Sequence, residues 1–371
     1  MRHRHAFSSL LALAVFLSLA PTALASSTWY VDAVHGSDNN DCKSPQTACK
    51  TIGHAISLAS ARDSIMVAAA TYTENLTIRV SLKIVGSGAT TTIIDGGGVS
   101  TVVTIPHAGS HVTLSKLTIQ HGSAISGGGI YSNGTLTINN TAVSGNSAYN
   151  GSKYGGAFGG AICNCGTGTL TINNSTVSGN STTGSHPHGG GISNVGTLII
   201  NNCTLSGNSA GPGICCNYSS GGGIYNGGTL TINNSTLSGN SATGGVGGGG
   251  IFNIRGTTTL QDSIVAGSSG GNCDGTMTSN GYNLSSDGTC NFSNTGDLNN
   301  TDPVLGPLQN NGGPTQTQAL LSGSPAIDAG NPSGCTDGQG HLLTTDQRGQ
   351  PRPDKEDSGG CDMGAYESQK D

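Results

Sequence analysis

The chain is short of charge and of aromatic residues. Only 9% of its 371 residues are charged and 4% are aromatic, with a single tryptophan. A compact helical enzyme would contain more Leu, Ala, Glu and Lys, and a nucleic-acid-binding domain would be basic, whereas the formal net charge here is −6. The 33% share of hydrophobic residues is also low for an ordinary globular domain. These shortages argue against a helical enzyme and against a nucleic-acid partner.

Glycine is abundant instead, at 62 residues, and it comes in clusters. Collagen needs glycine at every third position, which these clusters do not provide. A disordered chain would carry more charge and would lack the regular apolar rows seen here. The composition therefore indicates a β-rich, turn-rich, secreted protein.

Residues 1–25 have the pattern of a secretory signal peptide. Arg2 and Arg4 precede an apolar run at residues 10–20, and Ala-Leu-Ala at 23–25 is an A-x-A cleavage site. An uncleaved anchor is the alternative, although the apolar run is short for a bilayer. Because no later stretch is apolar enough to span a membrane, we expect an exported, soluble protein that begins at Ser26.

Eleven cysteines in an exported chain predict disulfides. Proximity in the sequence predicts three pairs: Cys42 with Cys49, Cys273 with Cys290, and Cys335 with Cys361. Five cysteines remain, so at least one thiol stays free or pairs between chains: Cys163, Cys165, Cys203, Cys215 and Cys216. Since Cys203 aligns with small Ser and Thr residues of other repeats, we expect a buried, unreactive thiol there.

Some of these cysteines, with two histidines, are soft-ligand candidates for a zinc or copper ion: Cys163, Cys165, His186, His188, Cys215 and Cys216. Oxidation after export favours disulfides for the cysteines, and loop positions leave the histidines in solvent. We therefore expect no metal site and no cofactor.

An internal repeat fills the middle of the chain. Each copy begins with a glycine cluster and Ile, runs through a T-L-T-I strand, turns at Asn-Asn and ends in S-G-N; residues 221–242 read GGGIYNGGTLTINNSTLSGNSA. The copies start at Gly127, Gly159, Gly189, Gly221 and Gly248. Apolar residues alternate with Thr, Ser and Gly, which is typical of β-strands.

Aligned copies give four apolar columns. These are Ile130, Ile162, Ile192, Ile224 and Ile251; Leu136, Leu170, Leu198 and Leu230; Ile138, Ile172, Ile200, Ile232 and Leu260; and Val143, Val177, Leu205, Leu237 and Val265. One copy has too few apolar residues to form a core by itself. Copies stacked at the ~4.8 Å strand spacing form a continuous core of about eight to ten coils. Four asparagines stack likewise into a ladder: Asn146, Asn180, Asn208 and Asn240. The repeat predicts an all-β, right-handed parallel β-helix, with a β-propeller as the alternative.

The two ends of the chain differ from the repeats. Residues 50–61 place Ile52, Ile56 and Ala59 at helical spacing, which predicts a short helix capping the N-terminal end. Prolines and acidic residues gather in the tail, which indicates a C-terminal cap or small domain. The predicted organisation is a signal peptide (1–25), an N-terminal cap (26–63), the parallel β-helix (64–296) and a C-terminal domain (297–371).

Three parts of the chain resemble known families. The segment YVDAVHGSDNNDCKSPQTACKTI, followed by AATYTENLTI, resembles the opening of secreted β-helix proteins of the pectin-lyase-like superfamily. The repeats resemble those of polymorphic outer-membrane-type proteins. The tail, with DPVLGPLQNNGGPTQTQALLSGSPAIDAGN, TDQRGQPRP and CDMGAYE, resembles the choice-of-anchor Q domain of bacterial surface proteins. These resemblances imply secretion and a cell-surface location.

The superfamily includes lyases, hydrolases and epimerases of acidic polysaccharides, whose chemistry requires carboxylates or basic residues. Residues 96–261 contain no Asp or Glu, which excludes a paired-carboxylate site on the central coils. Asp262 follows this region, at a turn position that other copies fill with Asn140, Asn174, Asn202 and Asn234. We therefore interpret Asp262 as a turn residue and predict no catalytic residue.

Variable insertions all follow S-G-N, at residues 147–158, 181–188, 209–220 and 241–247. Stacking lines them along one side, where solenoids commonly bind partners. They contain the candidate binding residues Tyr149, Lys153, Tyr154, Phe158, His186, His188 and Tyr218, although the rings could instead pack the loops onto the coil. We expect a non-catalytic, secreted or cell-surface scaffold that binds an extracellular glycan or a surface protein. A polysaccharide-active enzyme is the alternative.

Overall fold

The structure is a computed structural model that describes residues 26–213, 218–244, 247–337, 339–354 and 360–369. The predicted signal peptide and the pair Cys215 and Cys216 lie outside the described residues. Among the residues that are described, no helix is both long enough and apolar enough to cross a membrane.

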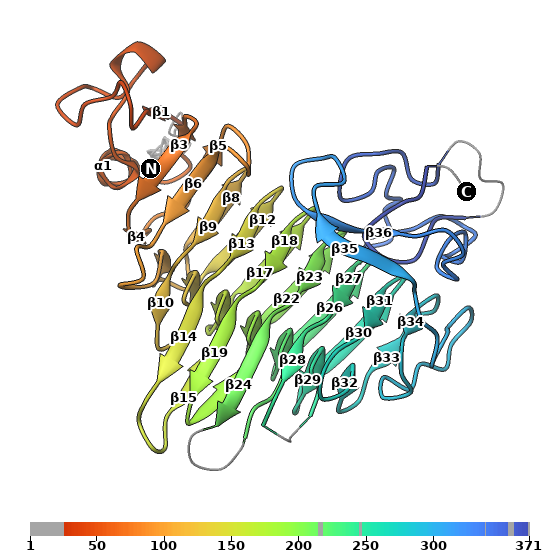
Figure 1. The fold of residues 1–371 in the computed structure, drawn as a ribbon. Coiled ribbons are helices and arrows are strands. Elements are labelled where there is room, and N and C mark those ends of the chain that lie inside the picture. The colour runs from red at the N-terminus through yellow and green to blue at the C-terminus, as the bar shows by residue number, and fades with distance from the viewer. Residues whose placement is uncertain (1–25, 214–217, 245–246, 338, 355–359, 370–371) are drawn as a thin grey trace, which may run out of the picture.

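Three long parallel sheets form the walls of a solenoid (Figure 1). Sheet A contains β1 (Thr28–Val31), β2 (Ser64–Val67), β5 (Leu82–Gly86), β8 (His111–Ser115), β12 (Thr135–Asn139), β17 (Thr169–Asn173), β22 (Thr197–Asn201), β26 (Thr229–Asn233), β30 (Thr257–Gln261) and β33 (Thr278–Ser279). Sheet B contains β3 (Ala70–Thr73), β6 (Thr92–Asp95), β9 (Thr118–Gln120), β13 (Ala142–Ser144), β18 (Thr176–Ser178), β23 (Thr204–Ser206), β27 (Thr236–Ser238), β31 (Ile264–Ala266) and β34 (Leu284–Ser285). Sheet C contains β4 (Leu76–Thr77), β7 (Val103–Ile105), β11 (Ile130–Ser132), β16 (Ile162–Asn164), β21 (Ile192–Asn194), β25 (Ile224–Asn226), β29 (Ile251–Asn253) and β32 (Cys273–Asp274).

Each coil supplies one strand to sheet C, then to A, then to B. The predicted parallel β-helix is therefore confirmed, and the nine strands of sheet A from β2 to β33 agree with the predicted number of coils. Pairing is in register, so that Ile162 lies between Ile130 and Ile192 on neighbouring coils. All residues of the four predicted columns are at most 1% exposed, and they form the main core.

The corner between sheets A and B is one left-handed residue per coil. Asn140, Asn174, Asn202, Asn234 and Asp262 occupy it, all with φ between 48° and 51°. The interpretation of Asp262 as a turn residue is confirmed. The glycine that opens each repeat copy has a similar geometry: Gly159 has φ of 63°, and a Cβ there would collide with the carbonyl oxygen of Ile162.

Three asparagine ladders run along the stack. The predicted inner ladder is present, with Nδ2 of Asn146, Asn180 and Asn208 donating to Oδ1 of the next asparagine at 2.9–3.0 Å. A second buried ladder joins Asn164, Asn194, Asn226 and Asn253. A third joins Asn139, Asn173, Asn201 and Asn233 on the outer side of sheet A. The second and third ladders were not predicted from the repeat.

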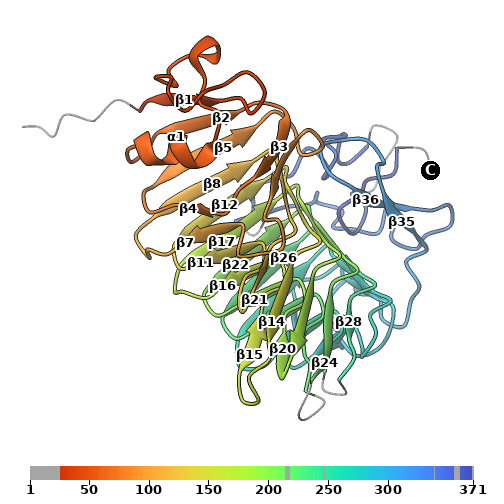
Figure 2. The same ribbon diagram turned by 60° about the vertical axis from the view of Figure 1, so that its left-hand side comes forward.

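The predicted N-terminal helix is α1 (Ile52–Leu58), which covers the first coils (Figure 2). It begins at Ile52 because the hydroxyl of Thr51 accepts from the His54 amide, and the Glu74 carboxylate accepts from the first two helical amides at 2.8–2.9 Å. Ile52 and Ala55 are buried in the core. The short helical turn η1 (Pro45–Thr47) precedes it, next to the Cys42–Cys49 disulfide.

The C-terminal end of the stack is covered by the loop around Phe292. Phe292 is 5% exposed and belongs to the main core, and the Cys273–Cys290 disulfide ties its loop to the last coils. The described residues after 301 lie beside sheet B, where β35 (Leu305–Gln309) and β36 (Thr317–Leu320) form an antiparallel pair (Figure 1). The tail therefore covers a side wall of the solenoid.

The described residues contain four disulfides. Three are the pairs expected from proximity, Cys42–Cys49, Cys273–Cys290 and Cys335–Cys361, and the fourth joins Cys163 to Cys165. Cys203 is a free, fully buried thiol, and burial raises its pKa to about 12. The prediction of a buried thiol at Cys203 is confirmed.

Candidate functional site

The insertions form extra strands along one edge of the solenoid. Sheet D contains β10 (Ser123–Ala124), β14 (Ser147–Asn150), β19 (Ser181–Gly184), β24 (Ser209–Gly213) and β28 (Ser241–Ala242), and sheet E contains β15 (Gly156–Phe158) and β20 (His186–His188). We call residues 147–158, 181–188, 209–213 and 218–220 the fin. It lies at the lower edge of the solenoid in both views (Figures 1 and 2).

Three tyrosines of the fin face solvent. Tyr149 on β14 is 54% exposed, Tyr154 is 83% exposed in the turn that follows, and Tyr218 is 50% exposed. The Lys153 ammonium lies 5.5 Å from the centroid of the Tyr154 ring. The fin therefore presents solvent-exposed aromatic rings on a surface that is poor in charge.

The other candidate rings pack at the base of the fin. Phe158 stacks on His188 at 5.4 Å between centroids, and His188 contacts Tyr225 at 4.6 Å. Nδ1 of His188 lies 2.7 Å from the Ser220 hydroxyl, and burial lowers the pKa of His188 to about 4, so the ring is neutral. These rings fasten the fin to sheet C. His186 is half-buried, 6.4 Å from the ring of Tyr218.

Tyr225 and Phe252 continue this row of rings, with centroids 5.7 Å apart, and were missed from the sequence. Both occupy the position after the inward Ile of their copy, which faces outward on a strand. An aromatic residue at this outward position is the sequence signal that could have predicted the row of rings.

The outer face of sheet D carries hydroxyl groups on successive coils. Ser123, Ser147, Ser181, Ser209 and Ser241 pair in register along the sheet. Tyr149 follows Ser147 by two residues, so it projects from the same face, and alternate residues such as Ala148 are buried. Hydroxyls at the ~4.8 Å strand spacing, next to a free tyrosine, form a continuous polar strip.

A carboxylate and an imidazole lie together at the N-terminal end of this face. Their pairing was not predicted from the sequence. Nδ1 of His121 lies 2.8 Å from Oδ2 of Asp95, on the preceding coil. Gln120 Nε2 also donates to this oxygen at 2.9 Å, and the Gly97 amide donates to Oδ1 at 2.9 Å. Burial opposes ionisation of Asp95, but hydrogen bonds from Gln120 and Gly97 outweigh it and, with the imidazole, hold the pKa of Asp95 below its usual range.

These residues border an open groove of about 590 Å³, which we call the Asp95–His121 groove. Its remaining lining is Gly97, Gly98, Gly122, Ser123, Gly145 and Ser147. The His121 side chain is 59% exposed and that of Asp95 is 17% exposed, so a ligand in the groove reaches the imidazole first. Because β10 and β14 supply the two serines, the groove joins the polar strip of sheet D.

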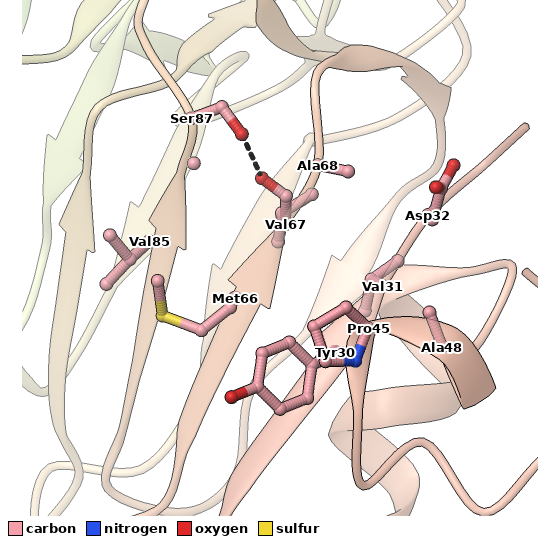
Figure 3. A pocket seen from close by; sticks show the side chains of 11 residues that line it. Tyr30, Val31, Asp32, Pro45, Ala48, Met66, Val67, Ala68, Val85 and Ser87 are labelled. Carbon is pink, nitrogen blue, oxygen red and sulfur yellow. Dashed lines mark hydrogen bonds between the residues drawn. The ribbon is translucent and has the colours of Figure 1, made fainter.

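A smaller groove of about 210 Å³ lies at the N-terminal end of the outer face of sheet A. In Figure 3, Tyr30, Met66 and Val85 line the groove, with Pro45 beside Tyr30. Asp32 and Ser87 lie at its margin, where the Ser87 hydroxyl donates to the Val67 carbonyl at 3.1 Å. The groove is mostly apolar and carries no pair of groups suited to acid–base chemistry.

The tail motifs form one buried ion network. Arg352 Nε lies 2.6 Å from Glu367 Oε2 with both side chains fully buried, and Arg348 Nε lies 2.7 Å from Asp346 Oδ2. Burial raises the pKa of Glu367 to about 7, against the opposing charge of Arg352. Since a substrate does not reach buried groups, these carboxylates hold the tail together.

The tail also binds the turn residues of consecutive coils. The bonds are Thr315 Oγ1 to Asn174 O (3.3 Å), Asn202 Nδ2 to Thr345 O (2.9 Å), Arg352 Nη1 to Asn202 Oδ1 (3.1 Å), Asn234 Nδ2 to Thr336 O (2.7 Å) and Asn331 N to Asp262 Oδ1 (2.8 Å). Asp262 is fully buried in this contact, and burial raises its pKa to about 6. The carboxylate thus serves tail docking.

The soft-ligand candidates do not come together as one cluster among the described residues. Cys163 and Cys165 bond to each other, and His188 bonds to Ser220. The groupings of cysteine with histidine or carboxylate that do occur are Cys42, Cys49 and His54, and Asp262, Cys335 and Cys361. Their cysteines are in disulfides, so these sulfurs are not thiolate ligands.

A scan against protein-family models gives no match to this chain, and a sequence search of curated proteins gives none. Solved structures of the same fold do match. The crystal structure of pectate lyase Pel9A has a TM-score of 0.53 at 15% sequence identity, over 93% of this chain and 97% of that chain. The pectin methylesterase from Aspergillus niger has a TM-score of 0.41 at 14% identity, over 75% and 86% of the two chains. Pectin methylesterase PemA from Erwinia chrysanthemi has a TM-score of 0.40 at 14% identity, over 81% and 87%.

The likeness to pectate lyase Pel9A, together with the order of strands in the parallel sheets, establishes the class of the molecule by its fold, a right-handed parallel β-helix. At 15% identity it establishes the fold alone.

Proposed function

We propose that the protein is an exported or cell-surface scaffold that binds an extracellular glycan along the fin and the outer face of sheet D. The observation that carries the proposal is the set of solvent-facing rings of Tyr149, Tyr154 and Tyr218. Exposed aromatic rings stack on sugar faces, and their hydroxyls bond to sugar hydroxyls. The serine row beside them supplies further hydrogen-bonding groups at the spacing of one coil.

The low charge of this region supports a glycan over a charged partner. Residues 96–261 contain no Asp or Glu, and their only basic residues are Lys116, Lys153 and Arg255. Export rests on the predicted signal peptide and is supported by the four disulfides. A surface location rests on the resemblance of the tail to the choice-of-anchor Q domain.

The alternative is a polysaccharide-active enzyme, favoured by the fold that the chain shares with pectate lyase Pel9A. Cleavage of a polysaccharide backbone by hydrolysis commonly requires two carboxyl groups at the site. The fin has none, because all of its residues lie within 96–261. We therefore propose binding without backbone cleavage.

The test replaces Tyr149, Tyr154 and Tyr218 by Ala together and measures binding to a glycan array and to insoluble polysaccharides. Three lost ring contacts should weaken binding at least about tenfold. The matched control replaces Val195 and Ile254 by Ala. These two residues lie outside the fin and are 54% and 46% exposed, so binding should persist. Undiminished binding by a folded triple variant would refute the fin as the site. Release of reducing sugars or unsaturated products by the wild type would favour the alternative.

A further inference from the structure

His121 stands at a backbone position where the five following coils have glycine. Its φ is 52°, in the left-handed region, and the register of sheets B and D aligns it with Gly145. The equivalent glycines of the later coils, Gly179, Gly207, Gly239 and Gly267, have φ of 59–64°. A residue with a Cβ is strained here, and strained non-glycine residues cluster at functional sites.

The position of His121 sets its hydrogen bonding. An ionised Asp95 carboxylate can only accept, so Nδ1 of the imidazole carries the hydrogen, and in the neutral form of the ring Nε2 then has the lone pair for a ligand. The free edge of the ring lies over Gly145, where a Cβ would come within 4.0 Å of Nε2. The neighbouring glycine therefore leaves the Nε2 side of the ring open to the groove.

The lining of the groove restricts the chemistry. Asp95 and His121 are its only titratable residues, so it offers neither the second carboxylate of a glycosidase nor a Lys or Arg to neutralise a uronate. Hydrolysis of an ester needs only a general base for water and hydrogen-bond donors for the oxyanion. Ser123 and Ser147 supply hydroxyl donors in the same groove.

We propose that Asp95 and His121 form a general-base site that hydrolyses O-acyl esters of neutral polysaccharides. Nε2 of His121 takes a proton from water as the water oxygen bonds to the acyl carbon, and the carbonyl electron pair moves to its oxygen. The serine hydroxyls donate to this oxyanion. When the tetrahedral intermediate collapses, the bond from the acyl carbon to the sugar oxygen breaks, and the imidazolium returns the proton to that oxygen. The products are a free sugar hydroxyl and a carboxylic acid.

The choice of a polysaccharide as the substrate rests on the proposed glycan-binding function, because the groove continues into the same face of sheet D. The chemistry itself does not depend on the fin. The proposed ester hydrolysis differs from the expectation of a non-catalytic protein, which rested on the absence of Asp and Glu from residues 96–261. A histidine base needs only one carboxylate, and Asp95 lies just outside that range.

The chain contains matched controls. His341 and His35 also contact aspartates, Nδ1 to carboxylate oxygen at 3.1 Å, and they are 74% and 82% exposed. Exposed imidazoles hydrolyse activated esters slowly by themselves, so these two residues set the background. Their partners lie three or four residues away in the same loop, whereas Asp95 comes from the neighbouring coil.

The test compares the full-length protein with His121→Gly, Asp95→Asn and His341→Gly, using acetate release from acetylated xylan and hydrolysis of p-nitrophenyl acetate. His121→Gly introduces the residue that the five following coils have at this position, so the fold should persist, which circular dichroism checks. We expect both substrates to turn over, a loss of about 100-fold or more in His121→Gly, and no change in His341→Gly. Asp95→Asn should also lower the rate, because it no longer stabilises the imidazolium.

Three results would overturn the site: no acetate release by the wild type from either substrate, full activity in both His121→Gly and Asp95→Asn, or an equal loss in His341→Gly. Because p-nitrophenyl acetate does not need the fin, His121-dependent hydrolysis of it without any glycan binding would refute the proposed function and leave the catalytic site standing. Glycan binding without ester hydrolysis would do the reverse.

Discussion

Replacing Asn208 by Ala removes one rung of the inner asparagine ladder. The side chain is fully buried, and its Oδ1 accepts from the backbone amide of Asn180 at 3.2 Å and from Nδ2 of Asn180 at 2.9 Å. Its Nδ2 donates to the Val177 carbonyl at 2.9 Å and to Oδ1 of Asn240 at 3.0 Å. The substitution therefore deletes four hydrogen bonds that water does not reach.

The expected cost follows from which groups lose a partner. The Asn180 amide loses its acceptor inside the core, and three further bonds are lost, so the free energy of unfolding should fall by about 3–6 kcal/mol. Asn201 lies on the same coil and also has two ladder bonds of 2.9 Å, but it is only partly buried. Because water replaces lost bonds at the surface, Asn201→Ala should cost no more than about 1 kcal/mol.

Urea unfolding followed by far-ultraviolet circular dichroism measures both variants against the wild type. Both variants replace an Asn by Ala on the same coil, so the two proteins differ only in the position of the substitution. A cost below about 1 kcal/mol for Asn208→Ala, or an equal cost for the two variants, would refute the reasoning that burial determines the value of a ladder bond.

Two further predictions concern the core and the docked tail. Ile224→Asp places an unpaired carboxylate at a fully buried position and should lower the free energy of unfolding by several kcal/mol. The control Thr231→Asp, on the outer face of sheet A, should change this free energy little. An Ile224→Asp variant that melts at the same temperature as the wild type would contradict the inward position of Ile224. Burial raises the pKa of Asp262 from 3.8 to about 6. As pH rises, the Asp262 carboxyl therefore ionises at lower pH in the unfolded chain than in the folded one, and the folded state loses stability between about pH 4 and pH 6. Asp262→Asn should therefore match the wild type at pH 4 and exceed it by up to about 2–3 kcal/mol at pH 8 in urea unfolding; a difference that does not change with pH would refute this origin.

The sequence predicted those features that depend on the period of the repeat. The four apolar columns and the ladder from Asn146 to Asn240 recur at the same point of each copy, and in-register stacking is the arrangement that buries them all. The helix at Ile52–Leu58 was predictable because its spacing and its Thr51 cap are local. Local and periodic features need no knowledge of distant contacts.

The position of the tail was not predictable in this way. Its bonds to Asn202, Asn234 and Asp262 join residues 69 to 150 positions apart, and nothing in the repeat marks which wall the tail will cover. The turn asparagines were recognised as structural from their spacing. Their second role, as hydrogen-bond partners of the tail, comes from the polar side chains that the turn leaves facing outward.

The Asp95–His121 pair was missed because it lies in a coil where the repeat is degenerate. Gln-His-Gly at 120–122 replaces the Ser-Gly-Asn of later coils, so a comparison of copies passes over it. The structure shows what the replacement does: it puts an imidazole where glycine is favoured and holds the ring with a carboxylate from the coil before. In a solenoid, repeated residues are explained by the stacking itself, because each rung needs the same side chain. Stacking does not explain a costly departure from the repeat, and in this protein such a departure coincides with the Asp95–His121 pair in the degenerate coil.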